Sequence, residues 1–179
     1  RRPKKNTVSQ TAVCAVVQDE FKVEVVPHMI CGGAAEYDIQ NDLYDFNFMG
    51  VSNILALRGD FNPKASCEPK KDFLHASDLI AYLKTKGDFH IMGACYPEGH
   101  QEAVSLEADI DNLKRKVDAG ATHLLSQLFF DNDAFFFAKV LQVVLETGAE
   151  VDVETPDATN EGLGISVVVC SDFAVCATH

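Results

Sequence analysis

No segment of the chain stays apolar for the roughly 20 residues that a bilayer-spanning helix needs, so the sequence predicts no transmembrane helix. We also expect no secretory signal peptide. Cations are scarce, because 15 Lys and Arg residues stand against 27 Asp and Glu residues, giving a net charge of -12. Such a chain repels phosphate backbones and anionic lipid surfaces, which argues against nucleic acid and membranes as partners. An anionic ligand would need a local cluster of cations.

Several chemical signatures are also missing. The sequence has no GxGxxG or Walker motif, no serine in a nucleophile elbow, no CxxC pair and no zinc-type spacing of Cys and His, so we expect no metal site. The cysteines are therefore interpreted as reduced, largely buried thiols of a cytoplasmic protein. They are Cys14, Cys31, Cys67, Cys95, Cys170 and Cys176.

The composition itself is ordinary for a globular protein, with 179 residues of which 47% are hydrophobic, and it predicts a single domain over 1–179. Its most informative stretch is a short apolar run, 53–57, that stops at Arg58, Gly59 and Asp60. The run suits a parallel strand covered on both faces, and charged residues after such a strand lie where α/β proteins bind ligands. The alternatives are a solvated Arg-Asp pair and an adhesive Arg-Gly-Asp loop.

Hydrophobic periodicity predicts alternating strands and helices, which indicates right-handed βαβ units on a parallel sheet of five or six strands. The fold class is therefore α/β. A closed eight-stranded barrel usually takes ~250 residues, so the sheet is either open and doubly wound or part of a barrel. The predicted helices are 7–21, 37–49, 75–86, 105–119 and 133–147, and the predicted strands are 23–31, 53–57, 89–96, 122–130 and 150–154, with 165–170 as a further candidate.

Polar residues recur where the predicted strands end, which favours a shared pocket over isolated loop contacts. They are His28, Arg58 with Asp60, Tyr96 with His100, and Gln127 with Asp131. On the following helix Asp109, Asn112 and Lys116 share one face with Arg115 further round, and the alternative is a solvated, salt-bridged face. We interpret His90, on the interior side of an apolar run, and His123 as structural or surface histidines.

Particular motifs carry a family resemblance. PHMICGG at 27–33, ALRGD at 56–60, YPEGH at 96–100, LKRKVDAGA at 113–121 and QLFFD at 127–131 occur in the order and spacing of methylenetetrahydrofolate reductase. The resemblance covers 1–148, and 149–179 is a divergent tail. It implies a partial (β/α)₈ TIM barrel that holds FAD and passes a hydride from NAD(P)H to 5,10-methylenetetrahydrofolate. The product, 5-methyltetrahydrofolate, belongs to one-carbon metabolism and methionine biosynthesis.

The resemblance also implies site residues. Asp60 and Gln127 stand at the catalytic positions that contact folate and nicotinamide, and a carboxylate near the flavin N1 edge would favour hydride release. Arg58, Arg115 and Lys116 can offset the charge of the diphosphate, and Tyr96 offers a flat face with a polar tip. The implied FAD contacts are His28, Arg58, Gly59, Asp60, His75, Ala76, Tyr96, His100, Ala103, Asp109, Asn112, Arg115 and Lys116.

Two departures from the family pattern shape the expected activity. The family tends to have a tyrosine before the alanine where this chain has His75 and Ala76. The strand that carries the family's general-acid glutamate stands before Arg1, so we expect this chain alone to be weakly active or inactive. The alternative is a non-catalytic fragment or a flavin-binding or interaction module, whose exposed sheet edges would favour pairing with other chains, homo-oligomers included.

Overall fold

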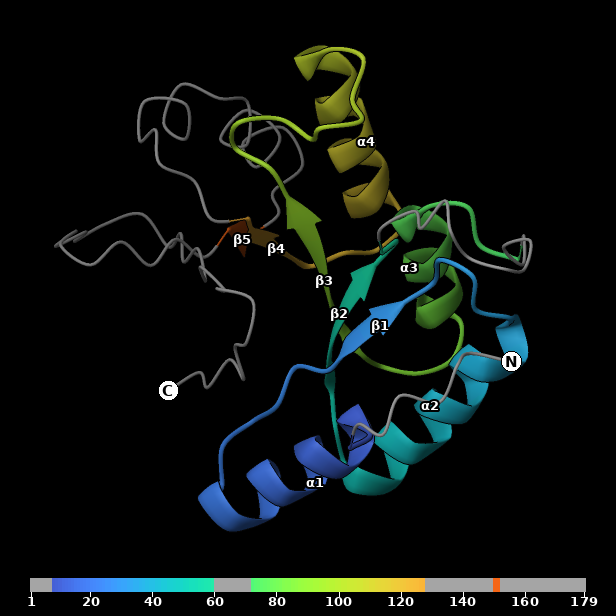
Figure 1. Cartoon of the computed structure of the whole chain (residues 1–179), viewed down its shortest axis with the longest axis vertical. Coiled ribbons are helices and arrows are strands. Elements are labelled where there is room, and N and C mark those ends of the chain that lie inside the picture. The colour runs from blue at the N-terminus through green and yellow to red at the C-terminus, as the bar shows by residue number, and fades with distance from the viewer. Residues whose placement is uncertain (1–7, 60–71, 128–149, 152–179) are drawn as a thin grey trace, which may run out of the picture.

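A computed structural model describes residues 8–59, 72–127 and 150–151, where five parallel strands form one sheet in the order β1-β2-β3-β4-β5. The strands are β1 (His28–Ile30), β2 (Asn53–Leu57), β3 (His90–Cys95), β4 (His123–Ser126) and β5 (Glu150–Val151) (Figure 1). A doubly wound sheet would reverse its strand order at a switch point. The doubly wound alternative is therefore wrong, and the sequential order is that of consecutive barrel strands. Closure of the barrel stays a prediction.

Each of the first three strands is followed by a helix that leads to the next strand. These helices are α2 (Glu36–Met49), α3 (Ala76–Lys84) and α4 (Leu106–Asp118), and Figure 1 shows them on the same side of the sheet, while α1 (Gln10–Phe21) precedes β1. The predicted helix 133–147 and strand 165–170 lie outside the described residues, and of the tail 149–179 only β5 is described. No helix in the described part of the chain is both long and apolar enough to cross a membrane.

The core lies between the sheet and these helices. Leu79, Ile80 and Leu83 of α3 are fully buried, as the helical spacing of 75–86 predicted. On the sheet, Ile54 and Ile91 are register partners and are equally buried. Burial of one such side chain stabilises a fold by about 1.5–3 kcal/mol, so this contact holds β2 and β3 in place and fixes the ends of both strands.

The opposite face of the sheet is less covered. His28, Leu55, Met92 and His123 form one row across β1 to β4, since each is the register partner of the next. His90 belongs to this face too and is exposed, so its predicted interior position is wrong. A strand alternates its faces, and packing of Ile91 against the helices turns its neighbour His90 outward.

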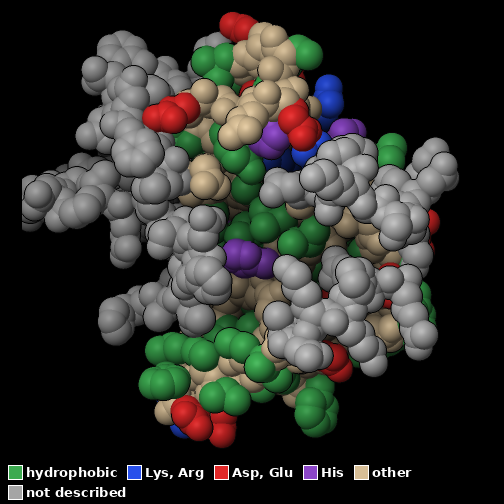
Figure 2. Space-filling model, in the orientation of Figure 1, with side chains coloured by type: hydrophobic (Ala, Val, Ile, Leu, Met, Phe, Trp, Pro, Cys, Tyr) green, Lys and Arg blue, Asp and Glu red, His purple; other side chains and the backbone are tan. Residues whose placement is uncertain are grey.

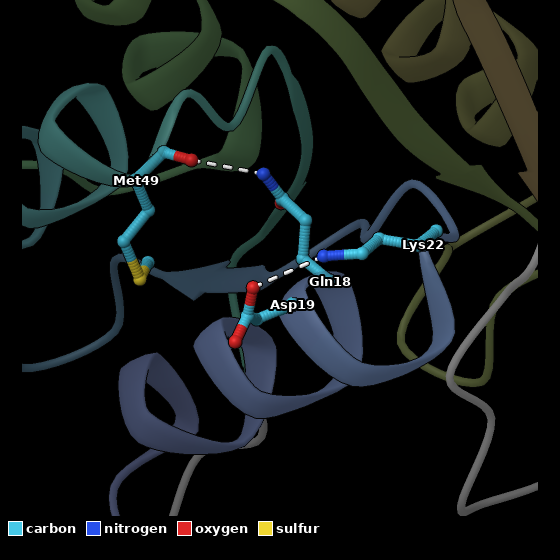
Figure 3. Close-up of polar contacts among 4 residues, drawn as sticks. All are labelled: Gln18, Asp19, Lys22 and Met49. Carbon is cyan, nitrogen blue, oxygen red and sulfur yellow. Dashed lines mark hydrogen bonds and ion pairs between the residues drawn. The ribbon is translucent and has the colours of Figure 1, made fainter.

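The region before β1 differs most from expectation. The predicted strand 23–31 contributes only His28–Ile30 to the sheet. In α1, Cys14 faces the core, whereas Val13 and Val16 are exposed at 41% and 51%. The rotation of α1 is set at its far end, where Gln18 Nε2 donates to the carbonyl oxygen of Met49 at 2.9 Å (Figure 3). Figure 2 accordingly shows hydrophobic side chains gathered over α1 at the lower end of the molecule.

Candidate functional site

An ion pair joins the end of β2 to the loop that follows β3. Arg58 Nη1 lies 2.7 Å from Glu102 Oε2, and Arg58 Nε donates to the Gly59 carbonyl at 3.3 Å. The hydrogen bond and the charge of Arg58 hold the pKa of Glu102 below its ordinary value. The arginine thus stands where the sequence predicted a ligand-binding cation, and a carboxylate already contacts it.

A second cation reaches the same end of the sheet from α4. Lys116 Nζ donates to the carbonyl oxygen of Ala94 at 2.6 Å, and the lysine stem passes beside Gly93, where an added Cβ would lie 3.5 Å from Lys116 Cδ. Burial lowers the pKa of Lys116, the neighbouring Cys95 thiol and Asp109 carboxylate raise it, and Arg58 lowers it further. Two cations from separate elements thus stand at the same end of the sheet.

The loop between β3 and α4 is held by backbone contacts to side chains. Asp109 Oδ2 accepts the backbone N–H of His100 at 2.9 Å, and His100 Nδ1 accepts the N–H of Glu102 at 3.1 Å. The rings of Tyr96 and His100 meet edge to face, with centroids 4.6 Å apart. Asp109 therefore places the loop that carries Glu102. Figure 2 shows cationic, anionic and histidine side chains together near α4.

Two glycines allow the turn after β1 to approach the end of β2. An added Cβ at Gly32 would lie 2.5 Å from the Arg58 carbonyl oxygen, and one at Gly59 would lie 2.5 Å from Ile30 Cγ2. Gly59 also has φ +80°, which disfavours any L side chain. Gly32 N–H donates to the Arg58 carbonyl at 2.7 Å, so the backbone of Arg58 is tied to the turn after β1.

Comparison with known proteins bears on this cluster. The family model described as methylenetetrahydrofolate reductase matches residues 2–154. The chain belongs to this family. It is 42% identical over 119 residues to 5,10-methylenetetrahydrofolate reductase of Escherichia coli K12, covering 66% of this chain and 39% of that protein. The enzyme of the same name from Pectobacterium carotovorum is 34% identical over 142 residues, covering 79% and 46%.

A third relative, from Buchnera aphidicola subsp. Baizongia pistaciae, is 46% identical over 114 residues, covering 63% of this chain and 37% of that 5,10-methylenetetrahydrofolate reductase. The chain thus spans less than half the length of these curated relatives. A crystal structure from Burkholderia cenocepacia J2315, described as a lyase/mutase, has a TM-score of 0.56 at 16% identity and covers 93% of this chain and 62% of its own. That likeness shows the parallel α/β fold alone.

The structure brings together only some of the positions implied by the family resemblance. Arg58, Tyr96, His100, Asp109 and Lys116 form the cluster described above, and Gly59 and Ala103 flank it in the same loops. Asp60 and Asp131 lie outside the described residues.

Other predicted positions lie apart from these contacts. Asn112 and Arg115 are exposed on α4, where Arg115 Nη1 donates to Asn112 Oδ1 at 3.2 Å. His28 was predicted at the end of its strand, but it is the first residue of β1, and desolvation lowers its pKa although the residue is exposed. This short strand puts His28 level with Leu55 in the middle of β2, below Arg58.

The remaining positions occupy a helix start and a strand end. His75 is exposed, and its carbonyl oxygen accepts a hydrogen bond from Cys31 Sγ at 3.6 Å, while Ala76 is buried as the first residue of α3. Gln127 is exposed directly after β4, and its N–H donates to the Cys95 carbonyl at 2.8 Å. Gln127 thus lies at the same end of the sheet as Arg58 and Tyr96.

Sequence reasoning missed Glu102, Gly32 and Ser126. A lone carboxylate in a loop gives no local signal that it contacts Arg58, which is distant in sequence. Ser126 is 2% exposed, and among the described residues its buried Oγ has no hydrogen-bond partner; Cys95 is its register neighbour. In the described part of the chain no group of His, Cys, Asp and Glu could hold a metal ion.

Proposed function

We propose that this chain is part of an FAD-dependent reductase that converts 5,10-methylenetetrahydrofolate to 5-methyltetrahydrofolate with NAD(P)H. The observation that carries the proposal is that Arg58 directly follows β2 and the Lys116 ammonium contacts Ala94 near the carboxyl end of β3, in a chain of net charge -12. A diphosphate needs such a local pair of cations, and the ends of parallel strands are where barrel enzymes bind ligands.

The described residues fit the cofactor chemically. Arg58 presents a planar fork of donors, and the half-buried ammonium of Lys116 donates to the Ala94 carbonyl oxygen. Tyr96 offers an aromatic surface whose orientation is fixed by His100. FAD, when bound, would supply the hydride chemistry; the role of these residues is to bind and orient it. An anionic group arriving at Arg58 would compete with Glu102 for the guanidinium.

We assign the substrate side to Gln127 and Asp60. Gln127 lies exposed after β4, so its side-chain amide is available to hydrogen-bond a pterin or a nicotinamide.

The proposed setting is a partial barrel in the cytoplasm. The sequential order of the parallel strands supports the barrel. Cys14, Cys31 and Cys95 are free and buried, as predicted, which is usual in a reducing compartment. A flavin-binding or interaction module without turnover is the second candidate, favoured by the exposure of His28 and Ile30 on the less covered face of β1.

Flavin binding by the purified chain tests the proposal. The chain is mixed with FAD, free cofactor is removed, and absorbance near 450 nm is read; affinities for FAD and for riboflavin, which has no phosphate, follow from titrations. We expect Arg58→Gln and Lys116→Met to weaken FAD binding about tenfold each and riboflavin binding much less, because about 1.4 kcal/mol corresponds to tenfold.

The matched control is Lys22→Met, which removes an exposed cation at the C-terminal end of α1 and should leave FAD affinity unchanged. If the wild-type chain retains no flavin, the binding proposal for this chain is wrong. If all three variants lose affinity equally, the effect is net charge and not a site.

A further inference from the structure

Helix α2 has two apolar faces. Ile39, Leu43 and Phe46 are buried against the core. Tyr37, Tyr44 and Phe48 are exposed at 70%, 64% and 92%. At about 100° per residue these three aromatic side chains fall within a narrow stripe on the side of the helix opposite the buried residues. A helix on the surface of a globular protein normally carries one apolar stripe, and a second one marks an interaction surface.

The exposed stripe follows the spacing of a coiled-coil seam. Tyr37, Asn41, Tyr44 and Phe48 are separated by four, three and four residues, which places them at positions d, a, d and a of a heptad pattern. We call these four residues the outer seam. A polar Asn at an a position is the feature that fixes register and partner number in helix pairs. The residues at position e, which flanks the seam, are Asp38 and Asp45.

We propose that the outer seam of α2 docks one α-helix of a different protein, which packs lengthwise on it and carries Lys or Arg opposite Asp45. The charge of α2 supports this partner, because the helix holds four carboxylates, Glu36, Asp38, Asp42 and Asp45, and neither Lys nor Arg. Positions e and g decide which helices pair, so an acidic flank selects a basic partner.

A second copy of the chain fits the seam poorly. Antiparallel pairing of two α2 helices would oppose Asp45 to the aspartates of the other copy, and each copy has a net charge of -12. The helix is 14 residues long, about 21 Å, or two heptads. Its exposed aromatic side chains offer a few hundred Å² at roughly 150–250 Å² each, less than the ~800 Å² per partner of a stable interface. The complex should therefore be transient.

The test uses the full chain and two synthetic helices of three heptads, both with Leu at a and d, one with Lys and one with Glu at e and g. Binding is followed by fluorescence anisotropy of the labelled peptides. We expect the Lys peptide to bind about tenfold more tightly than the Glu peptide. The double variant Tyr44→Ser, Phe48→Ser should bind the Lys peptide about tenfold less tightly than the wild-type chain does. Val16→Ser, which alters an exposed apolar residue on α1, should change nothing.

Charge reversal separates seam recognition from general attraction. Asp45→Lys should weaken binding of the Lys peptide and strengthen binding of the Glu peptide. Circular dichroism should show that the fold of this variant is unchanged. The proposal fails if neither peptide binds better than a scrambled control. It also fails if the Tyr44 and Phe48 changes leave Lys-peptide binding intact, or if sedimentation shows a wild-type dimer that those changes dissociate, since a second copy would then occupy the seam.

Discussion

Replacement of Lys116 by methionine tests whether burying the Lys116 ammonium costs more stability than its hydrogen bond to the Ala94 carbonyl contributes. Lys116→Met keeps a stem of similar length beside Gly93 but removes the charge and the donor to the Ala94 carbonyl. Lys116→Ala removes the stem as well. The pair of variants therefore separates packing from charge.

The expected magnitude follows from opposing effects. Loss of a hydrogen bond from a charged donor destabilises the fold by about 1.5–3 kcal/mol. The Met variant, however, no longer buries a charged ammonium, and avoiding that desolvation stabilises it by several kcal/mol. Desolvation is also the largest cause of the lowered pKa of Lys116. We expect Lys116→Met to be within about 1 kcal/mol of wild type at pH 7, or more stable, while Lys116→Ala loses about 1–3 kcal/mol through the missing packing.

The pH dependence has a definite sign. The folded pKa of Lys116 lies below the ordinary 10.5, so between these two values the unfolded chain binds more protons and wild-type stability rises with pH. The Met variant lacks this rise. Cys95, whose pKa burial raises to about 12, acts oppositely above its ordinary 9.0, but it is present in both proteins. The free energy of unfolding of each protein is measured in urea from pH 7 to 10.5.

The reasoning is refuted if Lys116→Met is destabilised by more than about 3 kcal/mol at pH 7 and the difference from wild type is constant with pH. The hydrogen bond to Ala94 and the attraction of Asp109 would then outweigh desolvation. A loss in Lys116→Ala equal to that in Lys116→Met would show that the stem contributes nothing.

Other predictions concern the turns and the thiols. Gly59→Ala should lower the free energy of unfolding by about 2 kcal/mol or more, because the position combines a positive φ with a clash against Ile30. Gly33→Ala, also at positive φ but in open space, should lower it by only about 1 kcal/mol. Equal losses would contradict the close approach of Gly59 to Ile30. The Cys95 thiol should resist a thiol-specific reagent at pH 8 until the protein is unfolded in urea, since burial raises its pKa to about 12. Rapid labelling of Cys95 in the native protein would contradict this prediction, because it would show that the thiol is accessible.

Local periodicity was sufficient to predict most elements. The spacing of Ile39, Leu43 and Phe46 in α2, and of Leu79 and Leu83 in α3, identified the faces that are buried. It did so because a helix repeats every 3.6 residues, so spacing alone decides which side chains share a face. The same reasoning placed Arg58 after a buried strand, where the structure has it.

The order of the strands in the sheet, and the face of each strand that meets the helices, could be assigned only from the tertiary structure. Strand order decided between an open doubly wound sheet and consecutive barrel strands, and no pattern within one segment contains that order. His90 was assigned to the wrong side of its strand, because a short apolar run does not tell which of its alternating faces meets the helices.

The sequence alone determined the kinds of element, their order and the presence of cations at strand ends. Only the tertiary structure decided that Arg58 is paired with Glu102 and that Asp109 holds the backbone of His100. The physical reason is range. Helical and strand periodicity arises from neighbours along the chain, whereas the partner of a charged side chain depends on which distant loops the packed core brings within hydrogen-bonding distance.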